Sequence, residues 1–188
     1  MFDKIPGTVL PFQKGMEHHA FASLDPVLSA TKGLTLGQVS EITGLAGSTV
    51  QNWIKRGWVA SPKDKRYSET QLIRIILINM LRPALSLETI AALMEYINGS
   101  VEDRADDIIP DRLLFDYLCA VIYAADSAGT TDREEILALI ENETADFIRD
   151  GELDKKRLKN VLLCMTLSYL SAEMRQRAES EIQHTLQG

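Results

Sequence analysis

Two neighbouring side-chain amides, Gln51 and Asn52, are the groups in this sequence best suited to recognition chemistry. Each carries a hydrogen-bond donor and an acceptor in one plane, a pattern that can pair bidentately with the edge of an adenine base. Hydroxyl and ammonium groups suited to phosphate oxygens flank them, on Ser48, Thr49 and Lys55. The residue types and their spacing therefore indicate binding chemistry.

A second group of candidate contacts follows a few residues later, in the loop GWVASPKDKRY. It holds the cations Lys63, Lys65 and Arg66 and the phenol of Tyr67. Lysine and arginine bind phosphate oxygens through charge and carry no base-specific pattern there. If this loop lies beside the helix that carries Gln51, the two groups together form a surface for a nucleic acid.

The elements that must position these groups are readable from helix caps. Thr35 followed by Gln38 forms a capping box, which begins a helix that we expect to end at Gly44. A second short helix is predicted over 48–56, ending at Gly57. Two short helices joined by a tight glycine-containing turn are typical of a helix-turn-helix, whose second helix enters the major groove of DNA.

The order of motifs in this region resembles the DNA-binding domain of the mercury-resistance-regulator (MerR) family. The similar segments are TLGQVSEITGLAGSTVQNWIKRGWV and KRYSETQLIRIILINMLRPALSLETIAAL, over about residues 34–97. The resemblance implies a winged, homodimeric DNA-binding head in a transcription regulator. It implies that the recognition helix contacts DNA through Thr49, Gln51, Asn52 and Lys55, and that Arg66 and Tyr67 contact the backbone from the wing.

The chain also departs from that family. Ala46-Gly47 stands where the family usually caps its recognition helix with Ser or Asp, and Asn52 stands where it often has an aromatic residue. After Asn98 nothing resembles the family's long single dimerisation helix. The whole layout is instead similar to an uncharacterised bacterial family, a domain of unknown function, that pairs such a head with a helical tail.

Charge is distributed unevenly along the chain. The total is −7, yet residues 31–97 hold eight Lys/Arg against five Asp/Glu. Residues 98–188 hold ten Lys/Arg against nineteen Asp/Glu. Such an asymmetry suggests two roles, and a net positive segment is compatible with a DNA partner.

Further helices are predicted beyond the loop. Ser68 and Gln71 form a capping box for a strongly apolar helix closed by Pro83, and Ser86 caps a helix over 87–97. Asn98-Gly99-Ser100 and the acidic stretch 102–107 form a predicted linker. Three tail helices are predicted, over 111–125, from the box of Thr131 and Glu134 to about 150, and over 154–184. A short helix over 15–30, broken or bent at Pro26, precedes the head.

The tail helices 111–125 and 161–170 are apolar around most of their circumference, so they need cover on several sides. We expect homodimerisation through the C-terminal helices, with a closed monomeric bundle as the alternative. A small-molecule effector pocket is conceivable, but aromatic and methionine side chains at this spacing are more typical of a core; they are Phe115, Tyr123, Met165 and Tyr169. Trp53 and Trp58 are likewise expected to serve in packing.

Several classes of function find no motif here. There is no phosphate loop, no Gly-x-Ser-x-Gly turn and no two-histidine metal motif, so we expect no enzyme, no metal and no cofactor. Adjacent His18 and His19 point about 100° apart on a helix. Cys119 and Cys164 are expected as buried free thiols. The longest apolar run, 161–170, is too short for a membrane span, and no secretory signal is evident, which favours the cytoplasm.

The sequence therefore predicts an all-α protein, with a MerR-like winged helix-turn-helix domain followed by a small helical bundle domain. The expected divisions are a partly helical N-terminal extension (1–30), the DNA-binding domain (31–97) and an acidic dimerisation or regulatory domain (98–188). The predicted function is sequence-specific regulation of transcription on double-stranded DNA. Two alternatives stay open: a protein–protein adaptor without DNA binding, and a helical core unit with a solvated charged loop.

Overall fold

The protein is described by a computed structural model that covers residues 3–99, 107–148 and 151–187. Its regular structure in these ranges is helical, with only isolated β-bridges besides, so the all-α prediction is confirmed. The elements are the 3-10 helix η1 (Glu17–Leu24) and the α-helices α1 (Asp25–Thr31), α2 (Leu36–Thr43), α3 (Gly47–Lys55), α4 (Glu69–Leu81), α5 (Leu87–Asn98), α6 (Asp111–Ala128), α7 (Arg133–Glu143) and α8 (Glu152–Gln187).

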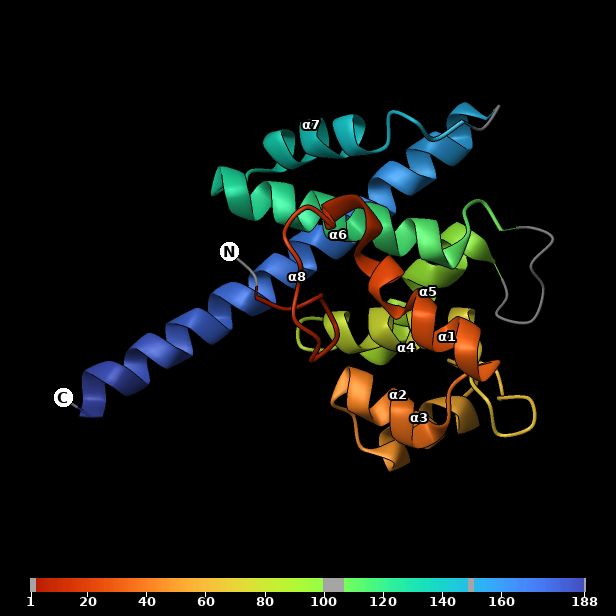
Figure 1. Cartoon of the computed structure of the whole chain (residues 1–188). Coiled ribbons are helices and arrows are strands. Elements are labelled where there is room, and N and C mark those ends of the chain that lie inside the picture. Colours follow the sequence, from red (N-terminus) through yellow and green to blue (C-terminus); the bar gives the residue numbers. More distant parts are fainter. Residues whose placement is uncertain (1–2, 100–106, 149–150, 188) are drawn as a thin grey trace.

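The core forms around α4 and α6. Nine of the thirteen residues of α4 are buried, as are twelve of the eighteen of α6. Helices α2 and α3 lie on one side of α4, and α6, α7 and α8 lie on the other (Figure 1). One continuous cluster of buried apolar side chains runs from Ile5 to Leu170, so the head and the tail share a core.

The cover for α6 comes from within the chain. Helix α6 contacts η1, α4, α7 and α8, and its Phe115 packs edge-to-face on Phe21 of η1, with ring centroids 6.1 Å apart. From the tail's apolar circumference we expect homodimerisation through the C-terminal helices, with a closed monomeric bundle as the alternative. The N-terminal segment (residues 3–24) and α4 cover part of α6 from within the chain, and homodimerisation stays a prediction.

Local capping signals explain where most helices begin. The boxes of Thr35 with Gln38 and of Ser68 with Gln71 both form, and Ser86 caps α5 through the N–H of Thr89, as predicted. The predicted box at Thr131 is wrong. Asp132 caps α7 instead, and its carboxylate accepts from the N–H groups of Glu134 and Glu135 at 2.9 and 3.1 Å.

Other boundaries differ by more. Helix α7 ends at Glu143, not near 150, and α8 begins at Glu152, two residues before the expected start. The break predicted at Pro26 lies close to the observed one, because η1 ends at Leu24 and α1 begins at Asp25. Pro26 stands in the first turn of α1, where its missing N–H costs nothing. A further kink lies inside η1 at His19, whose φ is −140°. Most of the predicted linker, 100–106, lies outside the described residues.

The thiol prediction is half correct. Both cysteines are free and Cys119 is buried, where desolvation raises the pKa of its thiol, but Cys164 is exposed on α8. Helix α8 is also the element that extends furthest from the body, with its C-terminal part projecting alone in Figure 1. Within the described residues, no helix combines the length and the apolarity that crossing a membrane requires.

Candidate nucleic-acid interface

Helices α2 and α3 are joined by a turn of three residues, Gly44, Leu45 and Ala46. Gly44 has a positive φ of 71° and ends α2 by donating its N–H to the carbonyl of Ser40. A side chain at residue 44 would also collide, since its Cβ would lie 2.8 Å from Val9 Cγ1. Leu45 is buried in the turn. The turn therefore fixes the angle between the two short helices, which is the property a helix-turn-helix requires.

One face of α3 is buried and the other is polar. Val50 and Trp53 point into the core, with 0% and 2% of their surface exposed. At 100° per residue, four polar residues fall within an arc of about 100° on the opposite side, and all four are exposed: Ser48, Gln51, Asn52 and Lys55. Thr49 lies beside this arc and is half-buried. The residues predicted to face a groove thus share one outward surface.

The predicted wing is a tight turn without strands. Lys63 and Arg66 form an isolated antiparallel bridge, and the N–H of Arg66 donates to the carbonyl of Lys63 at 2.8 Å. Asp64 and Lys65 between them have φ values of 49° and 58°, the pattern of a type I′ turn. Lys63, Lys65 and Arg66 are exposed. Three cations therefore stand on a short hairpin turn at the same end of the molecule as α2 and α3 (Figure 1).

Tyr67 does not belong with these exposed groups. Its side chain is 3% exposed, and this burial raises the pKa of its phenol. Its backbone N–H and carbonyl both pair with Leu34, at 2.8 Å each. Tyr67 thus connects the end of the turn to the residue before α2, and the contact with a ligand that the sequence predicted from it is not available to its side chain.

Side chains of α4 form hydrogen bonds with the segments that adjoin α2 and α3. The Nε of Arg74 donates to the carbonyl of Trp58 at 2.9 Å, at the end of the chain segment that leaves α3. The amide of Asn79 donates to the carbonyls of Gly7 and Thr43, at 2.9 and 3.0 Å. The end of α2 and the N-terminal segment are therefore tied to the same α4 side chain.

Trp53 is buried, as expected of packing, and Trp58 is half-buried beneath the guanidinium of Arg56.

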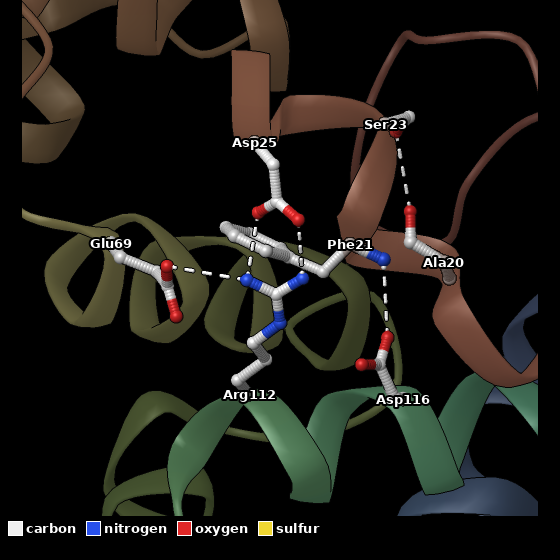
Figure 2. Close-up of polar contacts among 7 residues, drawn as sticks. All are labelled: Ala20, Phe21, Ser23, Asp25, Glu69, Arg112 and Asp116. Carbon is white, nitrogen blue, oxygen red and sulfur yellow. Dashed lines mark hydrogen bonds and ion pairs between the residues drawn. The ribbon is translucent and has the colours of Figure 1, made fainter. Parts of the chain in front are cut away.

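A polar junction connects α1, α4 and α6 (Figure 2). The Arg112 guanidinium donates to both carboxylate oxygens of Asp25 at 2.7 Å and lies 3.4 Å from Glu69. Asp116, one turn further along α6, accepts the N–H of Phe21 at 3.1 Å. Burial raises the pKa of Asp116, whereas the hydrogen bond from Arg112 lowers the pKa of Asp25.

Sequence patterns did not single out this junction, although one signal was present. Arg112 is the second residue of α6, where the positive end of the helix dipole disfavours a cation. A cation in that place needs a carboxylate partner. Glu69 opens α4 directly after the basic turn, so the junction links the turn's exit to the tail.

Two further predictions about ligands can be placed. The four residues considered for an effector pocket, Phe115, Tyr123, Met165 and Tyr169, are all buried in the core. In the parts of the chain that the structure describes, no three His, Cys, Asp or Glu side chains gather as a metal site would require. A cavity of about 370 Å³ does lie between the basic turn and α4, lined in part by Lys63, Arg66 and Arg74.

Comparisons with known proteins find one uncharacterized relative and one family. The uncharacterized protein YkrK of Bacillus subtilis (strain 168) is 27% identical over 112 residues, which are 57% of this chain and 48% of YkrK. The chain thus spans about half of the length of that curated relative. No solved structure matches the chain.

A family model matches residues 23–116, which are half of the chain. The match begins just before Asp25 and ends at Asp116, so the Arg112–Asp25 pair joins its two ends. It contains α2, α3 and the basic turn and crosses the boundary predicted at residue 98. The chain therefore belongs to the family described as a domain of unknown function, DUF1836.

Proposed function

We propose that this protein is a DNA-binding regulator of transcription that reads the major groove with α3 and contacts the phosphate backbone with the turn 63–66. The observation that carries the proposal is the polar face of α3. Gln51 and Asn52 are exposed on a helix whose other face is buried, and that helix follows a tight turn after α2. Exposed amides in this position suit base edges, and both side chains face away from the buried side of α3 that packs on the described core.

Charge placement supports the same proposal. Residues 31–97 are net positive in a chain whose total charge is −7. The exposed cations Lys55, Lys63, Lys65 and Arg66 lie on α3 or on the turn, on the other side of α4 from the acidic tail (Figure 1). A duplex approaching α3 would therefore meet cations first. The resemblance of residues 34–97 to MerR-type heads favours the same arrangement, in which α3 and the basic turn face the DNA.

The proposal includes a homodimer, because DNA regulators with one short recognition helix usually bind two half-sites through two copies. Helix α8 supplies the feature that suits pairing. Its residues 174–187 are all exposed, and they include the apolar side chains Met174, Ile182 and Leu186, at 56%, 57% and 80% exposure. A helical segment as short as 174–187 is only marginally stable when it stands alone in water. The same segment of a second copy, packed along it, would stabilise it.

Binding of the full-length protein to a fluorescently labelled random duplex, measured by anisotropy over a series of salt concentrations, tests the proposal. Roughly four to six phosphates neutralised per head should give a log–log slope near −4 to −5 per head. Lys65→Ala and Arg66→Ala should each lower the slope by about one unit. The matched control is Lys156→Ala on α8, which removes the same charge from the tail and should leave the slope unchanged.

Two results would contradict the proposal. A protein–protein adaptor would leave the anisotropy of the duplex unchanged, even at low salt. Equal effects of Lys65→Ala and Lys156→Ala would mean that DNA is attracted by charge in general, and the proposed interface would be wrong.

A further inference from the structure

The cavity beside the basic turn gathers positive charge on a concave wall. It holds about 370 Å³ between the segment 59–66 and the first turns of α4. Three cations line it, Lys63, Arg66 and Arg74, and none of the other described residues on its wall is acidic. A volume of this size falls in the range of small-molecule sites. The cavity is therefore suited to a small compound that carries negative charge.

Two of these cations have charge that no carboxylate of the chain offsets. The side chain of Lys63 forms neither an ion pair nor a hydrogen bond with the residues that the structure describes. Arg66 makes one long hydrogen bond, from Nη1 to the carbonyl of Gly33 at 3.4 Å. Arg74 is held differently, because it is buried and its Nε donates to the carbonyl of Trp58 at 2.9 Å. The ammonium of Lys63 and the guanidinium of Arg66 are thus available to a ligand.

The wall that faces α4 is in place before any ligand binds. The Nε2 of Gln71 donates to the carbonyls of Ala60 and Ser61, at 2.9 and 2.8 Å. Its Oε1 accepts the N–H of Ser68 at 2.8 Å and so completes the capping box of α4. One side chain therefore holds the segment 60–61 at a fixed distance from the helix. A preformed site loses less free energy to ordering when its ligand binds.

The start of α4 adds to the positive potential. Helix α4 has 13 residues, and Ser68, Thr70 and Gln71 at its beginning line the cavity. The first turn of a helix carries partial positive charge and favours an anion. Glu69, the acid of this turn, is not on the wall and lies 3.4 Å from Arg112 instead. Cations beside a helix start are the combination that binds phosphate groups.

We propose that this cavity binds the phosphate group of a small organic phosphate, and that this ligand competes with DNA for Lys63 and Arg66. A phosphate monoester carries about two negative charges near neutral pH, whereas each backbone phosphate of DNA carries one. The enclosed cations therefore favour the monoester over the duplex. The competition rests on the proposed function, in which the same two side chains contact the DNA backbone, but the cavity site itself does not.

Calorimetric titration of the full-length protein with glycerol 3-phosphate tests the cavity site. Glycerol is the neutral counterpart, and sodium chloride at matched ionic strength controls for screening of charge. Glycerol 3-phosphate should give a saturable heat of binding and raise the melting temperature in a concentration-dependent way, as a ligand of the native state does. Neither glycerol nor sodium chloride should do so.

Two variants of the same turn locate the binding. Lys63→Gln should weaken glycerol 3-phosphate binding by about tenfold, because a hydrogen bond to a charged group is lost. Lys65→Gln removes the same charge from an exposed side chain that does not line the cavity, and it should bind the ligand as the original protein does. Because Lys63 is exposed, Lys63→Gln should keep the melting temperature of the unliganded protein.

Anisotropy of a labelled duplex tests the competition. Glycerol 3-phosphate that replaces sodium chloride at constant ionic strength should release the duplex from the original protein and from Lys65→Gln. It should release much less duplex from Lys63→Gln, in which the cavity has lost part of its charge.

The outcomes separate the cavity site from the DNA interface. Absence of glycerol 3-phosphate binding, or equal binding by Lys63→Gln and the original protein, would overturn the cavity site and leave the DNA interface standing. Binding of the ligand and the duplex together would overturn the competition. If the protein binds the ligand but no duplex at any salt concentration, the cavity site is supported and the proposed function is wrong.

Discussion

Arg112 and Asp25 face each other through two nitrogen–oxygen contacts of 2.7 Å, although 87 residues separate them in the chain. Two parallel N–H···O bonds fix direction as well as distance. The pair therefore sets how α1 lies against α6, and the contact of Arg112 with Glu69 extends that relationship to the start of α4. Removing the Arg112–Asp25 pair should loosen the connection between the tail and the segment that follows the basic turn.

Asp25→Asn tests the strength of this pair through its pH dependence. The hydrogen bond from Arg112 lowers the pKa of Asp25 in the folded state. A lowered folded-state pKa stabilises the protein above the ordinary aspartate value, and this stabilisation is lost as the pH falls through the lowered value. Because the two side chains are 34% and 41% exposed, solvent screening limits the contribution to about 1 kcal/mol.

Urea unfolding at about pH 7 and at about pH 3 measures the effect. The difference in unfolding free energy between the original protein and Asp25→Asn should shrink at the lower pH. Asp64→Asn, at an exposed turn position, is the control and should show little difference at either pH. A difference for Asp25→Asn that is equal at both pH values would contradict the assignment.

Gly7→Ala and Gly57→Ala form a pair that separates backbone strain from collision. Both glycines have a positive φ, 74° and 77°, so alanine should cost each about 1–2 kcal/mol. A Cβ at residue 7 would also lie 2.5 Å from the carbonyl oxygen of Ile76, whereas one at residue 57 would meet nothing within 4 Å. We expect Gly7→Ala to cost about 1–3 kcal/mol more in urea unfolding. Equal costs would show that the N-terminal segment is not held against α4.

Gln51→Ala and Lys65→Ala should have different kinds of effect on DNA binding. Once a preferred duplex has been selected from a random pool, Gln51→Ala should reduce discrimination against a changed base pair by about 1–3 kcal/mol, with an unchanged salt slope. Lys65→Ala should weaken all duplexes alike and lower the slope by about one unit. If Asn52→Ala alters the preference between duplexes, Asn52 contacts a base, as Gln51 is proposed to do. If the variant weakens binding to all duplexes alike, Asn52 contacts the phosphate backbone.

The exposed end of α8 should control the oligomeric state. Replacing Ile182 and Leu186 together by Asp removes apolar surface from residues that are 57% and 80% exposed. Sedimentation equilibrium should then change from a dimer to a folded monomer. Gln183→Asp, exposed on an adjacent face, is the control and should remain dimeric. If the double variant also stays a dimer, the pairing surface lies elsewhere.

The two thiols should differ in reactivity. Cys164 is exposed, whereas Cys119 is fully buried and burial raises its thiol pKa, which leaves little of the reactive thiolate. A thiol-specific reagent should therefore modify one cysteine in the native protein and two in urea. Cys164→Ser should abolish the native reaction. Rapid modification of Cys119 under native conditions would mean that α6 is far less covered than the structure shows.

Most of the local structure could be predicted from the sequence, because helix caps act within four residues. Thr35 and Ser68 each have their partner three residues on, and both boxes form. The failure at Thr131 has the same origin. Thr131 and Asp132 can both cap, and the sequence alone does not say which carboxylate or hydroxyl turns toward the helix. Asp132 does so, and accepts two N–H groups.

The long-range structure could not be predicted in the same way. That η1 covers α6, or that Asp25 reaches Arg112, depends on contacts between segments about ninety residues apart. The prediction for one residue of the candidate site was wrong for this reason. The MerR resemblance made Tyr67 a backbone contact, but Tyr67 pairs with Leu34 and lies in the core. The exposed amides of α3 were predictable because amphipathic spacing alone assigns them to the outer face.

The attachment of the N-terminal segment has a consequence for how the chain folds during synthesis. Val9 donates to the carbonyl of Ile42 beside the turn before α3, while Phe21 rests on Phe115 and bonds to Asp116. The ribosome releases the first residues early, but their partners on α6 emerge only after about a hundred more have been added. A nascent chain interrupted after α5 would therefore already contain the side chains of α4 that hold α2 and the segment after α3, but η1 would lack its partners on α6.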